Sequence, residues 1–237
     1  MPALTLAFLD GRFDDALLLY EEVSALGEQL GVRLEPLSRF QAARRLIYTG
    51  DAALALQSLP SSNNRPILAH RAVCLAHLDR HDEALAIRER FGDVGSEEDE
   101  SGLHVLTCLL EAAVLGRDRE TAEALVRRLD GMATSALEIA TLVCIARLLG
   151  GAADLLGDAA AARGYYEQAL EVAGKIRFRP EIALTHLQLA ELQLRGAVQA
   201  ERGEALGHLD FAITEFREMK MQPSLERALR RKEVLKA

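Results

Sequence analysis

The stretch from Ala146 to Gly174, ARLLGGAADLLGDAAAARGYYEQALEVAG, decides the fold of this chain. Its apolar residues continue at helical spacing on both sides of one break, the pair Gly157-Asp158, and Ala162, Tyr166 and Ala169 follow that break at i, i+4 and i+7. This spacing places the three side chains on one face of a helix, and Gly followed by Asp is typical of a tight turn. The stretch therefore predicts two amphipathic helices joined by a short turn.

The same pattern recurs along the chain as a small or polar turn residue, a few mixed residues, and an Ala that opens a helix. The segments are 11–16, 50–55, 79–84, 116–122 with one extra residue, 157–162, and the looser 196–205. Their alanines, Ala16, Ala55, Ala84, Ala122, Ala162 and Ala205, lie 29 to 43 residues apart. A small side chain suits the close crossing of two helices, whose axes lie about 8–10 Å apart. The period indicates helix, turn, helix and linker.

Composition supports helices throughout, because Trp is absent, aromatic residues are 5% of the chain, and Ala, Leu, Glu and Arg dominate. We expect an all-α protein: a single right-handed α-solenoid (superhelix) of about six antiparallel helix pairs with a C-terminal capping helix. The expected units within the domain 1–237 are approximately 1–33, 34–62, 65–92, 102–131, 136–175 and 180–219, with the cap at 224–236.

The order of residues in the deciding stretch resembles the tetratricopeptide (TPR) repeat family. Leu149-Gly150, Ala153, Gly157-Asp158, Ala162 and Tyr166 follow one another as the corresponding residues do in that family. The longer period, near 40 residues, and the stretch from Ala146 to Leu229 resemble the extended C-terminal repeats of MalT-like and cyclase-associated bacterial regulators. The resemblance implies a superhelix that binds a protein or peptide in its concave groove.

The front of the chain departs from this pattern, because only residues 2–9 are available for the first helix of the first unit. The chain is therefore interpreted as an excised domain or a shortened descendant of a larger regulator. The sequence contains neither a phosphate-binding Gly-Lys-Ser/Thr loop nor a convincing DNA-reading helix-turn-helix, so those activities of the relatives are not carried over.

The formal net charge of −8 argues against a nucleic-acid or anionic-membrane partner. Three widely spaced cysteines, Cys74, Cys108 and Cys144, are typical of buried small hydrophobes in a reducing compartment, with a disulfide or metal site as the alternative. No run approaches the length of a membrane span, and the N-terminus lacks a basic leader. We expect a cytoplasmic protein.

Two charged segments stand apart from the repeats. Residues 92–101 are polar and acidic and are expected to form a mobile loop, with an acidic docking element as the alternative. The tail 217–237 carries seven basic residues against three Glu, and is interpreted as a solvated helix face or, alternatively, as an anionic docking site. The basic residues are Arg217, Lys220, Arg227, Arg230, Arg231, Lys232 and Lys236.

No constellation in the sequence predicts catalysis, a metal or a cofactor. His77 and His81 are four residues apart, but the repeat places His81 in a turn, with no third ligand nearby except Asp79 or Asp82. His186 and His208 are each expected alone on their helices, exposed or hydrogen-bonded. Neighbouring carboxylates lack surroundings that would separate their pKa values. We expect a protein that is not an enzyme.

The resemblance places the binding residues on the inward face of the first helix of each unit. Those predicted to contact a partner are Phe40, Arg44, Tyr48, His77, Glu111, Arg147, Asp154, Glu191 and Arg195. Arg44, Tyr48 and Arg147 are the preferred anchors, because Arg and Tyr are common binding anchors; ordinary surface or interhelix residues are the alternative. The carboxylate clamp of chaperone-binding relatives and the groove asparagines of peptide-pheromone receptors are absent.

The sequence thus predicts a non-catalytic scaffold or adaptor in bacterial signalling or regulation, which binds a protein or peptide in its groove. The alternative is a ligand-sensing regulatory domain that controls an attached or partner enzyme or transcription factor. The identity of the partner and the oligomeric state are left open by the residues.

Overall fold

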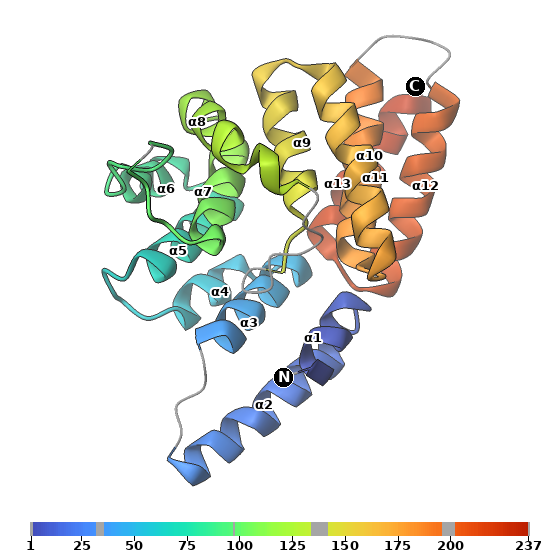
Figure 1. The fold of residues 1–237 in the computed structure, drawn as a ribbon. Helices are drawn as coiled ribbons and strands as arrows, with labels where there is room; N and C mark the ends of the chain where they lie inside the picture. Colours follow the sequence, from blue (N-terminus) through green and yellow to red (C-terminus); the bar gives the residue numbers. More distant parts are fainter. Residues whose placement is uncertain (1, 32–35, 97, 134–141, 196–201, 237) are drawn as a thin grey trace.

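The computed structural model describes residues 2–31, 36–96, 98–133, 142–195 and 202–236 (Figure 1). Helices make up 80% of the structure, and the described ranges contain no strand. The helices are α1 (Pro2–Leu9), α2 (Phe13–Leu30), α3 (Pro36–Thr49), α4 (Ala52–Ser58), α5 (Arg65–His77), α6 (His81–Arg88), α7 (Leu103–Gly116), α8 (Arg119–Leu129), the 3₁₀-helix η1 (Asp130–Met132), α9 (Ile145–Leu156), α10 (Ala159–Lys175), α11 (Arg179–Arg195), α12 (Arg202–Glu218) and α13 (Gln222–Lys236). The all-α class predicted from composition is confirmed.

Five of the six turns predicted from the sequence recur with the same backbone conformation, and residues 196–201 of the sixth segment, 196–205, lie outside the described residues. One residue in each of these turns has a positive φ. These residues are Gly11, Gly50, Asp79, Arg117 and Gly157. The next amide donates to the carbonyl five residues earlier, as from Asp158 N to Ala153 O at 2.9 Å. This is the hydrogen bond that closes a helix C-terminus when one residue is left-handed.

Aspartates begin three of the helices that follow these turns. The side chains of Asp51, Asp118 and Asp158 accept hydrogen bonds from backbone N–H groups three residues later. Such N-caps satisfy donors that the first helical turn leaves unpaired. The six marker alanines are all buried, as their place at helix crossings predicts; they are Ala16, Ala55, Ala84, Ala122, Ala162 and Ala205.

Each helix packs on its neighbours in the chain, and a second set of contacts joins alternate helices. From α3 onward, each odd-numbered helix contacts the next odd-numbered one, and α13 in turn contacts α3. We call α3, α5, α7, α9, α11 and α13 the inner ring. The ring surrounds the interior of the molecule, so the last helix lies beside one from the first quarter of the sequence (Figure 1).

Contacts near α1 also join the beginning of the chain to its last third. The rings of Phe8 and Phe178 lie 6.4 Å apart, and Arg179 donates to the carbonyl of Asp10 at 3.2 Å. The side chain of Met219 occupies the space that a Cβ on Gly11 would need. A helix is present where the C-terminal cap is predicted, as α13 beginning at Gln222, and its contact with α3 closes the inner ring.

The acidic segment 92–101 makes several specific contacts. The carboxylate of Asp99 is buried and accepts from the amides of Gly95 and Ser101 at 3.0 and 2.9 Å. Asp93 forms a two-bond ion pair with Arg65 at the start of α5. These contacts attach the segment to the body, while its mobility stays a prediction. No helix in the described ranges has both the length and the apolar character needed to cross a membrane.

A substitution at Gly150 tests how closely α9 and α10 cross. A Cβ there would lie 2.5 Å from two ring carbons of Tyr166, whose side chain is fully buried. We expect Gly150→Ala to lower the free energy of unfolding, although Ala is the better helix former by about 1 kcal/mol, because an overpacked core costs about 1–3 kcal/mol. Urea unfolding followed by circular dichroism measures the change.

Gly164→Ala is the matched control, since it lies in α10 and a Cβ there meets nothing within 4 Å. That substitution should raise the free energy of unfolding by up to about 1 kcal/mol. Equal stabilisation by both alanines would contradict the close crossing.

Candidate functional site

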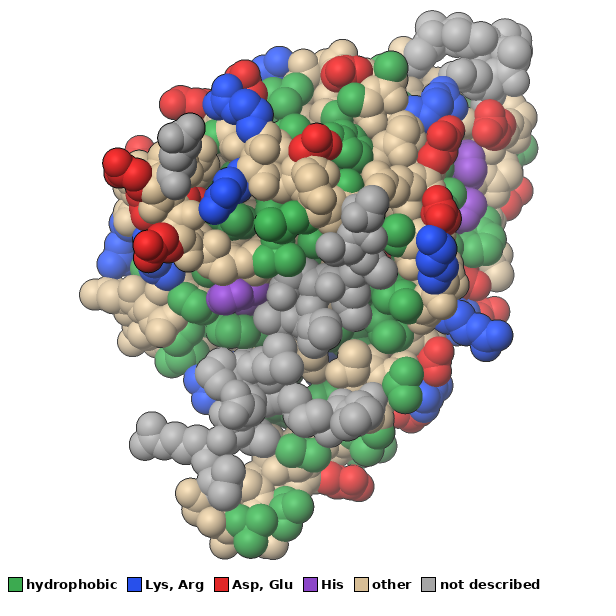
Figure 2. All heavy atoms as spheres, viewed as in Figure 1, with side chains coloured by type: hydrophobic (Ala, Val, Ile, Leu, Met, Phe, Trp, Pro, Cys, Tyr) green, Lys and Arg blue, Asp and Glu red, His purple; other side chains and the backbone are tan. Residues whose placement is uncertain are grey.

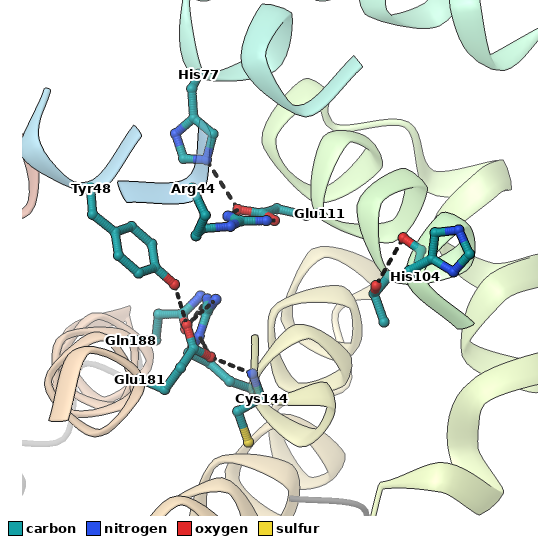
Figure 3. Close-up of polar contacts among 10 residues, drawn as sticks. Arg44, Tyr48, His77, His104, Glu111, Cys144, Glu181 and Gln188 are labelled. Carbon is teal, nitrogen blue, oxygen red and sulfur yellow. Dashed lines mark hydrogen bonds and ion pairs between the residues drawn. The ribbon is translucent and has the colours of Figure 1, made fainter. Parts of the chain in front are cut away.

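The carboxylate of Glu181 joins three helices inside the ring. Glu181 lies in the first turn of α11 and is fully buried. It accepts from Tyr48 of α3 at 2.7 Å, from Arg147 of α9 at 2.6 and 2.9 Å, and from the amide of Cys144 at 2.8 Å (Figure 3). Four hydrogen bonds and one countercharge offset the large cost of burying this charge.

A second buried pair lies beside the first. Arg44 of α3 donates to both oxygens of Glu111 of α7, at 2.7 and 2.6 Å, and His77 Nε2 of α5 lies 3.0 Å from the same carboxylate (Figure 3). Burial by itself raises the pKa of Glu111, but the Arg44 charge and the bonds from His77 and Arg44 bring it well below its ordinary value. Glu111 therefore stays ionised at neutral pH.

A cavity of about 260 Å³ opens next to both pairs. Its wall contains residues from all six helices of the inner ring, with apolar side chains between the polar ones. The polar lining residues are Tyr48, His77, Asp79, Glu111, Arg147, Gln188, Ser224, Arg227 and Arg230. Ligand sites combine apolar walls with polar groups that orient the ligand, and here polar residues make up half of the lining.

The predicted groove residues fall into two groups. Tyr48, His77, Glu111 and Arg147 line the cavity, as does their neighbour Gln188, which accepts from Arg147 at 3.3 Å. The others are not part of the cavity wall. Phe40 is buried against the ring of His70, Arg44 lies behind Glu111, Asp154 pairs with Arg195, and Glu191 pairs with Arg227 and Arg231.

The preferred anchors are not exposed cations. Arg44 is 3% exposed and Arg147 is 7% exposed, because each meets a carboxylate from another inner helix. Tyr48 is likewise buried, and burial followed by the nearby Glu181 charge raises its pKa well above its ordinary value. Their direct contact with a partner stays a prediction, and their observed role is to hold the cavity wall.

Sequence reasoning missed Glu181, Gln188 and the cavity-facing part of α13. Glu181, Leu184, Gln188, Glu191 and Arg195 are spaced by three or four residues and so share one face of α11. Extending the predicted register from Glu191 toward the N-terminus would have found them. Arg227 and Arg230 belong to the predicted basic tail, and the packing of α13 against α3, α11 and α12 brings them to the cavity.

The prediction for one histidine is wrong. His81 begins α6 instead of lying in the turn before it. His186 and His208 are hydrogen-bonded, one of the two predicted outcomes, and the partner of each is the other, because α11 and α12 pack together and place the two Nδ1 atoms 2.6 Å apart. Within the described ranges, no group of three or more His, Cys, Asp or Glu side chains is arranged to hold a metal ion.

The three cysteines are free and buried, as predicted. Burial, the largest cause, raises the pKa of Cys74 to about 12 and that of Cys144 to about 11. Both thiols therefore remain protonated, and a protonated buried thiol is a poor nucleophile.

Comparison with known proteins assigns no family to this arrangement. No protein-family model matches the chain, and no curated protein matches its sequence. The fold and the contacts described above therefore carry the functional argument.

Glu181→Gln tests the central carboxylate. The amide preserves the size of the side chain but leaves Arg147 buried without its countercharge, which costs about 3–5 kcal/mol of unfolding free energy in comparable sites. Urea unfolding of both proteins measures the loss. The control is Glu171→Gln, which removes an exposed ion pair with Lys175 and should cost no more than about 1 kcal/mol. Similar losses in the two variants would contradict the role of Glu181.

The buried His70 should make the folded protein less stable in mild acid. Burial, its largest cause, lowers the His70 pKa from 6.5 to about 3. Between these values the unfolded chain binds a proton that the folded chain does not, so the free energy of unfolding falls as the pH drops below 6.5, by up to about 1.4 kcal/mol per pH unit.

His70→Asn isolates this contribution, because the Asn amide can replace Nδ1 near the Pro66 carbonyl without titrating. The variant should be less stable at pH 7 but should lose less stability than the parent between pH 6.5 and 4.5. His186, whose pKa burial and His208 lower to about 4, keeps part of the slope in both proteins. Unchanged slopes would show that His70 does not titrate in this way.

Proposed function

We propose that this protein is a non-catalytic protein- or peptide-binding scaffold, and that the cavity inside the inner ring receives part of its partner. The architecture proposed with it is a TPR-like right-handed solenoid of about six antiparallel helix pairs, capped by α13. A cytoplasmic role in bacterial signalling or regulation is the corresponding biological setting, supported by the sequence resemblance and the three buried free cysteines.

Recurring local geometry supports the repeat architecture. A residue with positive φ, the same closing hydrogen bond and a buried Ala occur at the five predicted turns that lie within the described residues. Contacts between successive odd-numbered helices add the inner layer that stacked helix pairs form.

The observation that carries the binding proposal is the convergence of six helices on one cavity whose buried carboxylate, that of Glu111, is already paired. Both oxygens of Glu111 accept bonds from Arg44 and His77, so this carboxylate is committed to its neighbours. The side chain of Arg230, by contrast, is 68% exposed, and its ion pair with Glu226 measures 3.9 Å. The wall therefore offers the guanidinium of Arg230, which favours a carboxylate on the partner.

The cavity volume defines how much of a partner can enter. At about 260 Å³ the cavity is slightly below the usual range of about 300–1,000 Å³ for ligand pockets. It has room for one or two side chains or a chain end, while the remainder of a partner would lie outside the ring.

The chemistry of the wall supports binding over catalysis. A general base works best when its pKa is near the working pH, whereas the pKa of Glu111 lies well below its ordinary value. The Tyr48 hydroxyl is directed to Glu181, and Arg147 is held by the same carboxylate. These groups stabilise one another and are poorly suited to exchange protons with a substrate.

A ligand-sensing regulatory domain is the second candidate, and the small cavity volume favours it. A metabolite with a carboxylate and a compact apolar part would fit the same wall. Thermal-shift measurements with a panel of metabolites separate the two, since a ligand bound at a hundred times its Kd adds about 2.7 kcal/mol to the free energy of unfolding. Strong stabilisation by one metabolite, without any peptide ligand, would favour the sensor.

The binding proposal is tested with peptides selected from a random display library on the full chain. Selected peptides should carry an acidic residue or depend on their free C-terminal carboxylate. Arg230→Glu should weaken their binding at least tenfold, which equals about 1.4 kcal/mol, as measured by fluorescence anisotropy.

Arg217→Glu is the control for that experiment, because it reverses an exposed charge in the same basic stretch at a residue outside the cavity wall. Peptides that bind parent, Arg230→Glu and Arg217→Glu equally well would place the docking site elsewhere.

A further inference from the structure

Helix α2 is much longer than the helix that packs against it. α1 has 8 residues and α2 has 18, so at 1.5 Å per residue they are about 12 and 27 Å long. Leu4 and Ala7 of α1 pack on Ala16, Leu19 and Tyr20 in the first half of α2. The second half of α2 extends past the end of α1 (Figure 1).

An apolar stripe continues along that second half. Leu19, Val23, Leu26 and Leu30 are separated by four, three and four residues, which is the heptad spacing of a helix that packs along another helix. Leu19 is partly covered by α1, whereas Leu26 and Leu30 are 54% and 67% exposed. Hydrophobic side chains are visible at the lower end of the molecule, where α2 ends (Figure 2).

The charges on α2 all have one sign. The helix contains Asp14, Asp15, Glu21, Glu22 and Glu28 and no Lys or Arg. Asp14 pairs with Lys220 and Asp15 with Arg12, but the three glutamates form no ion pair with another described residue. Glu28 also lies in the last turn, where the helix dipole is already negative and no basic side chain offsets it.

We propose that the stripe Leu19, Val23, Leu26 and Leu30 is a docking surface for an amphipathic helix of another protein, whose apolar heptad positions are flanked by Lys or Arg. The apolar stripe supplies the contact area. Glu22 lies directly beside the stripe, and together with the other negative charges of α2 it selects a basic partner. A second copy of α2 is disfavoured because it would bring the two acidic sets together. This surface is separate from the cavity and does not depend on its function.

The probe for the test is a synthetic peptide of about three heptads with Leu at positions a and d and Lys at e and g. Its partner peptide carries Glu in place of every Lys. Fluorescence anisotropy with the full chain should show saturable binding of the Lys peptide, weaker at high salt because exposed charges are screened, and at least tenfold weaker binding of the Glu peptide.

Leu26→Ser combined with Leu30→Ser should weaken the Lys peptide at least tenfold without changing the circular dichroism spectrum. Leu54→Ser combined with Leu85→Ser removes two exposed leucines from α4 and α6 and serves as the matched control. Glu22→Gln leaves the apolar stripe intact and should reduce both the affinity and its dependence on salt. Glu28→Gln, on the opposite face of α2, should reduce them less.

Three results would overturn the proposal. The first is no saturable binding of the Lys peptide, and the second is equal binding by the parent and the Leu26→Ser, Leu30→Ser variant. The third is a dimer of the chain, seen by sedimentation and abolished in that variant, which would make a second copy the occupant. Failure of display peptides at the cavity would leave this test unaffected, because it uses another face and other variants.

Discussion

The carboxylate of Glu181 is the interaction on which the interior depends, because it joins α11 to a tyrosine 133 residues earlier in the chain. A charge in this fully buried position is tolerable only when every neighbour contributes a donor. Tyr48, Arg147 and the Cys144 amide do so, and in doing so they fix the mutual positions of α3, α9 and α11. The shape of the cavity follows from that arrangement.

Local features of the fold could be predicted from the sequence because they depend on neighbouring residues. Turns such as Gly157-Asp158 and the buried positions of Ala55 and Ala162 follow from spacing and side-chain size. The short first helix, ending at Leu9, also agrees with the position of the Gly11 turn. In these cases a few consecutive residues decide the conformation.

The long-range features could not be predicted in this way. Helical periodicity correctly turned Arg44 and Glu111 toward the interior, but it contains no information on which of two inward charges will meet. The ring closes because each helix is rotated relative to the one before it and these rotations add up along the chain. The total depends on the packing angles of all the helices together. For this reason Arg227 was assigned to a solvated tail, although α13 places it at the cavity wall.

Ring closure also changes how the molecule can unfold. In an open stack, each helix pair touches only the next, so the end pairs can separate one at a time. Here α13 contacts α3, and Arg179 donates to the Asp10 carbonyl. The first and last parts of the chain therefore support each other. Because such contacts join distant parts of the sequence, their loop-closure entropy must be overcome late in folding, and the structure should form slowly and as one cooperative unit.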